Sequence, residues 1–273
     1  MKEFKIKGGW PEFKELFLVI GKSFFREVRG PLFLYFMPIF FMILFYYTMG
    51  STYDKQAKVS LLFAYTLIPA LTIVTSLAPS LVNWKNSIFL KRLETAGLSK
   101  TKFLLTLYLF YFLAGLSGIA VQLTFALMLG GKPFIDALGH INALSFILGI
   151  VLVVLMCIAI SSFLGGISSN EGSMQGIVML IYFINLFLAG IMLPLNIVET
   201  TKVMHIVTYL IPLKYAAGVY NHAINEDSFI VHANNGNVFT EFNELWQPAV
   251  GALAIIAALF IINKFTFKWS AKK

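Results

Sequence analysis

The chain contains almost no cysteine and little charge. Cys157 is the single cysteine among 273 residues, so the chain can form no internal disulfide, thiolate metal cluster or dithiol redox centre. Charged residues make up 12% of the chain and hydrophobic residues 58%, whereas a soluble domain carries about 25% charged residues. This composition excludes an ordinary soluble domain and indicates a protein that lies in a membrane.

Motifs of catalysis are also missing. The chain has no G-x-x-x-x-G-K-[ST] loop, so it cannot bind ATP in the Walker manner, and it has neither H-E-x-x-H nor G-x-S-x-G. The histidines stand at unrelated spacings, at positions His140, His205, His222 and His232. We therefore predict no catalytic residue, no metal site and no cofactor bound by this chain, which we expect not to be an enzyme by itself.

The chain does have six apolar runs, each near or above the roughly 20 residues that cross a bilayer core. They cover residues 31–50, 59–82, 103–131, 141–168, 172–198 and 246–263. Outside these runs remain an N-terminal arm, short loops, one longer loop and a short basic tail. The prediction is a single transmembrane domain over residues 1–273, of the all-α integral membrane class with six transmembrane helices.

The basic residues are distributed unevenly between the loops. The net charge is +8, and most Lys and Arg residues precede the first run, separate the second from the third, or follow the sixth. The remaining loops carry only Lys55, Lys58, Lys132, Lys202 and Lys214. Because cytoplasmic loops hold the excess of Lys and Arg, we predict a multi-pass protein of the plasma (cytoplasmic) membrane with both termini in the cytoplasm. The charge then serves orientation at the lipid bilayer, and we expect no nucleic-acid partner.

The N-terminal arm has the pattern of an amphipathic helix over residues 11–29. Its apolar residues recur at helical spacing, at Phe13, Leu16, Phe17, Ile20 and Phe24. We expect an interfacial helix that lies on the cytoplasmic leaflet with this apolar side in the acyl boundary. Gly30 and Pro31 are predicted to end it.

The loop between the second and third runs predicts a short cytoplasmic helix over residues 85–97. Phe89, Leu93 and Ala96 share one helical face, Gly97 can close the helix, and Ser99 can cap the next one. Such a helix can be a docking surface for a soluble partner. The alternative is a basic loop that only fixes orientation.

The segment after the fifth run is expected to differ from an ordinary loop. Pro194 is predicted to end the span, and residues 195–245 form an outer re-entrant segment and loop. Its first part, residues 195–213, is apolar but interrupted by Glu199 and Lys202, and is expected to dip into the outer leaflet. Backbone at that depth needs packing against protein or contact with water.

The spans contain no carboxylate, which counts against a transporter driven by ions. A membrane-embedded enzyme would need convergent polar residues. The polar residues within the spans, Gln122, Ser161, Ser162 and Asn185, are too scattered to support one.

Three stretches resemble the type-2 ABC exporter permeases. They are FLKRLETAGLSKTKFLL (89–105), like the basic coupling helix of that family, SSNEGSMQGI (168–177), like its acidic turn, and the stretch 187–224, like its span-five ending and re-entrant segment. The order of the three stretches and the six spans also match. Two departures are Trp84-Lys85-Asn86, where the family often has an acidic residue, and Gly97, where it often has proline.

The resemblance implies a half-transporter without an ATPase site of its own. Two copies, or this chain and a paired permease, would form the pathway, and separate ATP-binding subunits would hold ATP and Mg. The residues implied in coupling to that ATPase are Phe89, Leu90, Lys91, Arg92, Leu93, Glu94 and Glu171.

The spans are uncharged and rich in aromatic residues, which favours a hydrophobic or amphipathic substrate such as a drug, a lipid-like molecule or a peptide. Candidate pathway residues are Tyr65, Thr72, Tyr182 and Asn185. Two alternatives stay open: a permease for lipid-linked polysaccharide export, and a membrane scaffold subunit that transports nothing.

Overall fold

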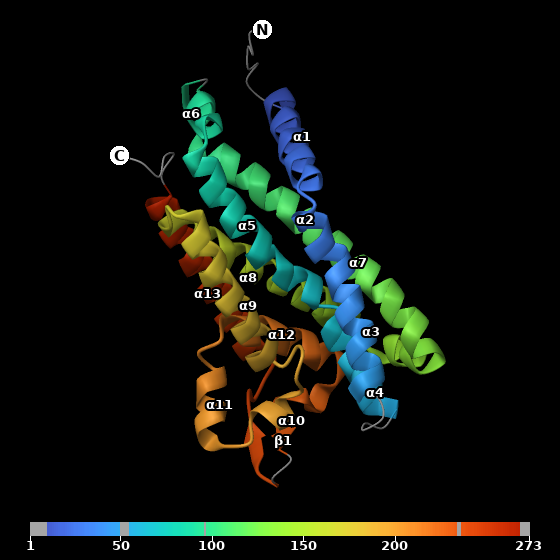
Figure 1. Ribbon diagram of the computed structural model, residues 1–273. Helices are drawn as coiled ribbons and strands as arrows, with labels where there is room; N and C mark the ends of the chain where they lie inside the picture. Colours follow the sequence, from blue (N-terminus) through green and yellow to red (C-terminus); the bar gives the residue numbers. More distant parts are fainter. Residues whose placement is uncertain (1–9, 50–54, 96, 234–235, 268–273) are drawn as a thin grey trace.

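In the computed structural model, which describes residues 10–49, 55–95, 97–233 and 236–267, helices make up nearly the whole chain (Figure 1). Within these described ranges, six helical segments are long and apolar enough to cross a membrane. They are Arg29–Thr48, Ala57–Asn86, Lys100–His140, Ala143–Ile167, Glu171–Leu188 and Trp246–Thr266. The six spans and the all-α membrane class are therefore confirmed, with some bounds shifted.

The chain begins with α1 (Trp10–Arg26), followed by α2 (Arg29–Pro31), the π-helical turn η1 (Leu32–Phe36) and α3 (Met37–Met49). The break after α1 lies at Glu27 and Val28, so the prediction that Gly30 and Pro31 end the arm is wrong. Both residues belong to the start of the first span. Proline is tolerated there because the first turn of a helix has no hydrogen-bond partner for its N–H.

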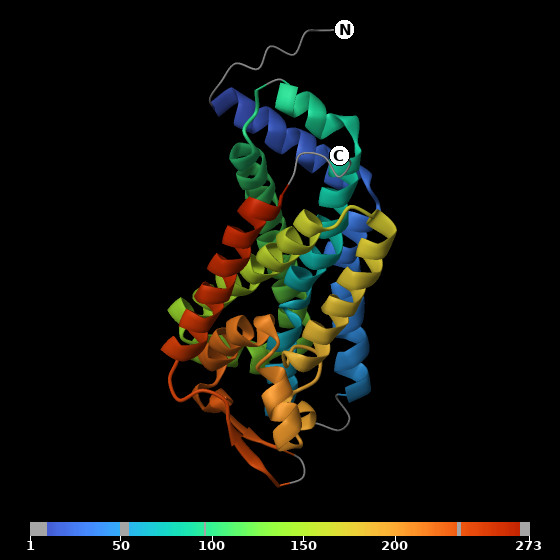
Figure 2. The same ribbon diagram turned by 90° about the vertical axis from the view of Figure 1, so that its left-hand side faces the viewer.

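The apolar side of α1 packs against protein instead of lipid. Leu16, Ile20 and Phe24 are buried, and the Phe24 ring lies 5.5 Å from that of Phe110 on α7 (Lys100–His140). Figure 2 shows α1 crossing the end of the bundle obliquely. The expected contact of this side with the acyl boundary is therefore wrong, because α7 extends far enough to cover it.

The second span is broken into α4 (Lys55–Tyr65) and α5 (Ile68–Asn86). The break at Thr66 and Leu67 precedes Pro69. Proline has no N–H to donate to the carbonyl four residues before it, that of Tyr65, and its ring would clash with that carbonyl in a continuous helix. α5 packs against α7, α8 (Ala143–Ile167) and α9 (Glu171–Leu188). It is the central element of the bundle, and the second span is the most buried of the six.

Side-chain caps mark where three of the other spans begin, and a glycine bends one of them. The short helix α6 (Ile88–Thr95) joins α5 to α7, and the side chains of Ser99, Asn142 and Asn170 cap α7, α8 and α9. α7 bends at Gly131, where φ is 55°. The last span is α13 (Trp246–Thr266), and Phe267 after it stacks on Phe103 at the start of α7.

The fifth span ends earlier than predicted. α9 ends at Leu188, ahead of a turn in which Gly190 has a φ of 75°, so Pro194 does not end it. The chain continues through α10 (Leu195–Val198), α11 (Lys202–Thr208), α12 (Pro212–Ile224) and the 3-10 turn η2 (Glu226–Phe229). Strands β1 (Ile230–His232) and β2 (Val238–Thr240) then form an antiparallel hairpin with Val231 opposite Phe239.

The most extensively buried helix of this region is α12, which begins at the end of the stretch 195–213 that was expected to enter the membrane. α12 packs against α8, α13 and α9 at the end of the bundle opposite α6 (Figure 1). The contact with α8 is close because α8 carries Gly149 there: a Cβ at this position would lie 2.6 Å from the Tyr220 Cα. The Tyr220 hydroxyl in turn donates to the Phe63 carbonyl at 3.0 Å and so ties α12 to α4.

Candidate functional site

The predicted coupling helix, α6, has one buried side and one open side. Leu90 is fully buried, and Phe89 is half-buried with its ring 6.1 Å from that of Trp84. Gly97, with a φ of 83°, closes the helix, and the Leu98 N–H donates to the Leu93 carbonyl at 3.0 Å. The buried side fixes how α6 sits on the bundle.

The open side of α6 is charged. Lys91, Arg92 and Glu94 are exposed, and Glu171 is exposed at the start of α9. Of the seven residues predicted to couple to an ATPase, these four are accessible to a soluble partner. Leu90 is not accessible, and Phe89 and Leu93 are half-buried.

A buried lysine joins the start of α6 to the turn that carries Glu171. Lys85, in the last turn of α5, donates to the Gly166 carbonyl at 2.9 Å and to the Ser168 carbonyl at 2.5 Å. The Asn86 amide donates to the Ser169 carbonyl at 3.1 Å. Carbonyls at a helix C-terminus lack intrahelical partners and carry partial negative charge, so an ammonium group is favoured there.

Sequence reasoning treated Lys85 as one orientation charge among several and missed this contact. Its acceptors are backbone carbonyls, which every residue has, so no residue type in the sequence indicates this contact. The contact means that the α5–α6 junction and the α8–α9 turn, the two places predicted to meet an ATPase, are connected directly.

The polar residues considered for a membrane enzyme lie apart and bind separate partners. Gln122 donates to the Pro38 carbonyl at 2.9 Å, and the Ser161 hydroxyl lies 3.4 Å from the Ile73 carbonyl. Ser162 belongs to a cluster with Tyr108 and Asn263 that links α7, α8 and α13. These contacts hold helices together.

The predicted pathway residues are all buried within the single subunit. Tyr65 and Thr72 lie on the second span, and Tyr182 and Asn185 on α9, which packs against it. The Thr72 hydroxyl donates to the Pro69 carbonyl at 2.7 Å, and the Asn185 amide to the Ile181 carbonyl at 2.8 Å. The Asn185 Oδ1 is buried and accepts no hydrogen bond from the residues that the structure describes.

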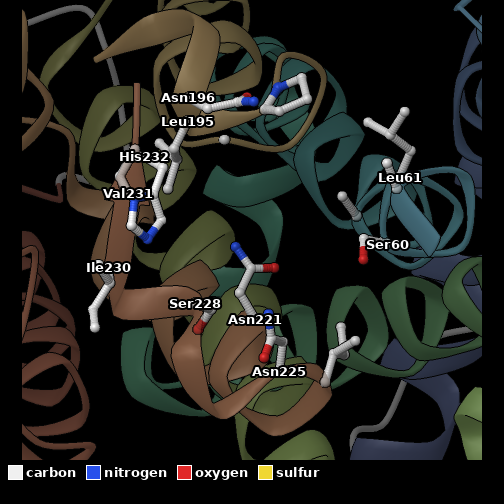
Figure 3. Close-up of a pocket in the computed structure, with 15 residues that line it drawn as sticks. Ser60, Leu61, Leu195, Asn196, Asn221, Asn225, Ser228, Ile230, Val231 and His232 are labelled. Atoms are coloured by element: carbon white, nitrogen blue, oxygen red, sulfur yellow. The ribbon is translucent and has the colours of Figure 1, made fainter. Parts of the chain in front are cut away.

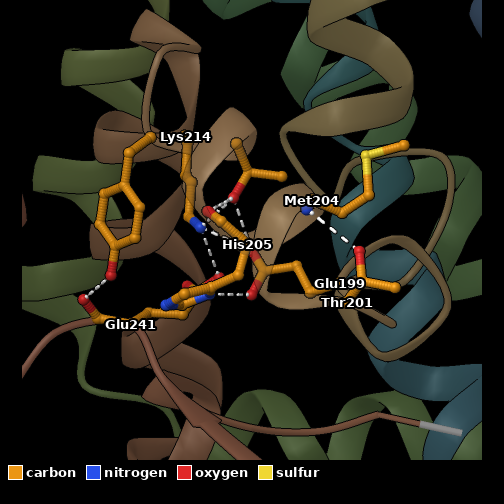
Figure 4. Close-up of polar contacts among 8 residues, drawn as sticks. Glu199, Thr201, Met204, His205, Lys214 and Glu241 are labelled. Atoms are coloured by element: carbon orange, nitrogen blue, oxygen red, sulfur yellow. Dashed lines mark hydrogen bonds and ion pairs between the residues drawn. The ribbon is translucent and has the colours of Figure 1, made fainter. Parts of the chain in front are cut away.

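A network of buried charges lies at the opposite end of the bundle, between α10, α11, α12 and the segment after β2 (Figure 4). The Lys214 Nζ lies 2.5 Å from Glu199 Oε1 and 3.0 Å from Glu241 Oε1. The His205 Nδ1 lies 2.6 Å from Glu199 Oε2, and the Thr208 hydroxyl donates to Glu199 Oε1 at 2.7 Å. Lys214 on α12 thus holds two carboxylates that are distant in sequence.

The two carboxylates of this network have opposite pKa shifts. Burial alone would raise the pKa of Glu199, but the hydrogen bonds from Lys214, His205 and Thr208 outweigh it and hold the pKa below its ordinary value. Burial raises the pKa of Glu241 to about 8, against the attraction of Lys214 and with the repulsion of Glu199. Glu199 is therefore ionised at neutral pH, whereas Glu241 retains its proton.

Comparison with known proteins identifies the family of this chain. No curated protein and no solved structure matches the chain. The profile of a family described as ABC-2 family transporter protein matches residues 51–263, from the start of the second span to the last. That match covers most of the chain, and the chain therefore belongs to the ABC-2 family, as a multi-pass membrane permease subunit of an ABC transporter.

Proposed function

We propose that this chain is the permease subunit of an ATP-driven exporter for hydrophobic or amphipathic molecules. The observation that carries the proposal is the structure of α6: an amphipathic helix fixed to the bundle by Leu90, with Lys91, Arg92 and Glu94 directed away from it. A separate ATP-binding subunit would dock on this side and hold ATP and Mg. Two copies of the chain, or one copy and a paired permease, would enclose the pathway.

The proposed orientation places α6 in the cytoplasm and α12 at the outer side of the plasma membrane. The exposed Lys91, Arg92, Lys100 and Lys102 at the α6 end support it, because cytoplasmic loops are enriched in basic residues. The predictions for the two chain ends concern residues outside the described ranges.

The proposed substrate class rests on the near absence of buried charge in the described spans. Lys85 is the one buried ammonium group in the described spans, and its two carbonyl acceptors already satisfy it. Aromatic and aliphatic surfaces bind amphipathic molecules without strict geometry. Export of a lipid-linked polysaccharide, or a scaffold role without transport, remain the competing proposals.

The test of the proposal is charge reversal on α6. We expect Lys91→Glu and Arg92→Glu, on the open side, to release the Walker-type ATP-binding subunit co-expressed from the same source, because rim charges govern association. Lys202→Glu, an exposed lysine at the opposite end, is the matched control. Copurification unchanged in both α6 variants would leave that helix with an orientation role only.

A further inference from the structure

A cavity of about 410 Å³ lies at the end of the bundle opposite α6. Its walls come from α4, the α9–α10 connection, the end of α12 and β1, as Figure 3 shows. The volume falls within the range of small-molecule sites, which is roughly 300–1,000 Å³. None of the residues assigned to the ATPase contact or to the substrate pathway lines it.

The lining of this cavity is polar but carries no permanent charge. Its polar side chains are amides, hydroxyls and one imidazole: Ser60, Asn196, Asn221, Asn225, Ser228 and His232. Apolar side chains such as Leu61, Leu195 and Ile224 complete the wall. No Asp, Glu, Lys or Arg is among the lining residues.

Some of this hydrogen-bonding capacity is unused. The Ser228 Oγ is buried and has no partner among the described parts of the chain. Leaving a buried hydroxyl without a hydrogen bond is unfavourable, so most such groups in folded proteins have a partner. In Figure 3 the Asn221 amide projects into the space between β1 and α4, with the Ser228 and Asn225 side chains below it.

We propose that this cavity is a binding site for an uncharged, hydroxyl-bearing group, either a free sugar or the sugar head of an amphiphile. Amides and hydroxyls both donate and accept hydrogen bonds, which is the pattern that a sugar ring offers. A phosphate, carboxylate or ammonium group would lose its hydration there without a counter-charge, which is costly. The apolar wall would contact the ring faces or the first methylenes of a chain.

The site can be tested without the ATP-binding subunit, so the result does not depend on the exporter proposal. In a Cys157→Ser background in lipid nanodiscs, Ser60→Cys places a thiol on the cavity wall and Thr240→Cys places one on the exposed β2 strand as a control. The rate of maleimide labelling is then measured with octyl glucoside below its micelle concentration, with glucose, and with octylphosphocholine.

We expect octyl glucoside to slow labelling at position 60 and not at position 240. Asn221→Leu and, separately, Ser228→Ala should each raise the protecting concentration by about threefold to tenfold, the value of one neutral hydrogen bond. Ser228→Ala removes only an unbonded hydroxyl, so it should fold normally.

The remaining ligands distinguish a free sugar from an amphiphile and give the results that would overturn the proposal. Protection by glucose at the same concentrations would assign the site to a free sugar, and protection by octyl glucoside alone would assign it to an amphiphile. Absence of protection by either sugar, or equal protection by octylphosphocholine, would overturn the proposal.

Discussion

Replacing Lys85 by methionine tests the connection between the two loops at the α6 end. The substitution keeps an unbranched, flexible side chain, one heavy atom shorter, and removes the ammonium group that binds the Gly166 and Ser168 carbonyls. Each carbonyl left without its donor costs about 1–3 kcal/mol when it is buried. The variant also avoids burying an ammonium group, which by itself costs several kcal/mol.

The two effects partly cancel, and we expect a net loss of about 2 kcal/mol in the free energy of unfolding. For a chain of this size that corresponds to a decrease in melting temperature of about 4–8 °C. Cys157 offers a direct assay because it is the only cysteine and is fully buried. A thiol-reactive fluorescent dye added during a thermal ramp reports unfolding through this residue.

Lys91→Met is the matched control, because Lys91 is exposed on α6. It should change the melting temperature little, as most surface substitutions do. Equal melting temperatures for Lys85→Met and Lys91→Met would refute the reasoning that the Lys85 contacts hold the two loops together.

Three further predictions concern packing, pH and topology. Gly149→Ala should lower the free energy of unfolding by about 1–3 kcal/mol, because its Cβ would clash with the Tyr220 backbone. Gly176→Ala is the control, since a Cβ there would have no neighbour within 4 Å. Equal melting curves for the two variants would refute the close α8–α12 contact. Because the native state holds the Glu241 proton up to about pH 8 and the unfolded state loses it near its ordinary pKa, stability should fall as pH rises through this interval. Glu241→Gln should flatten that dependence relative to the exposed Glu244→Gln, and an unchanged slope would contradict the assignment. In a Cys157→Ser background, Thr240→Cys should react with an impermeant reagent in intact cells and Ser99→Cys only after lysis; the opposite pattern would invert the topology.

The spans were predictable because the lipid imposes the same demand on every crossing segment. Hydropathy did not show where α9 ends, since residues 189–198 remain apolar after the helix stops. The turn at Gly190 depends on its positive φ, which composition does not reveal.

Other features depended on tertiary contacts. The apolar side of α1 has the same pattern whether it meets lipid or α7. The sequence places Lys214 in a loop, yet it is buried because Glu199, 15 positions away, supplies its counter-charge. Glu241, 27 positions away, also lies 3.0 Å from its ammonium group. Which residues line a pathway depends on which helix faces meet a second subunit, and a single sequence does not specify those faces.

The most direct test of the exporter account is transport in proteoliposomes that contain the chain with its ATP-binding subunit. The account predicts that an amphipathic fluorescent dye moves only with ATP and Mg, that the dye stimulates ATP hydrolysis, and that ionophores leave transport unchanged. Arg92→Glu should abolish both activities if the subunits no longer associate. Dye movement that persists without ATP and collapses when the ion gradients are dissipated would contradict the account.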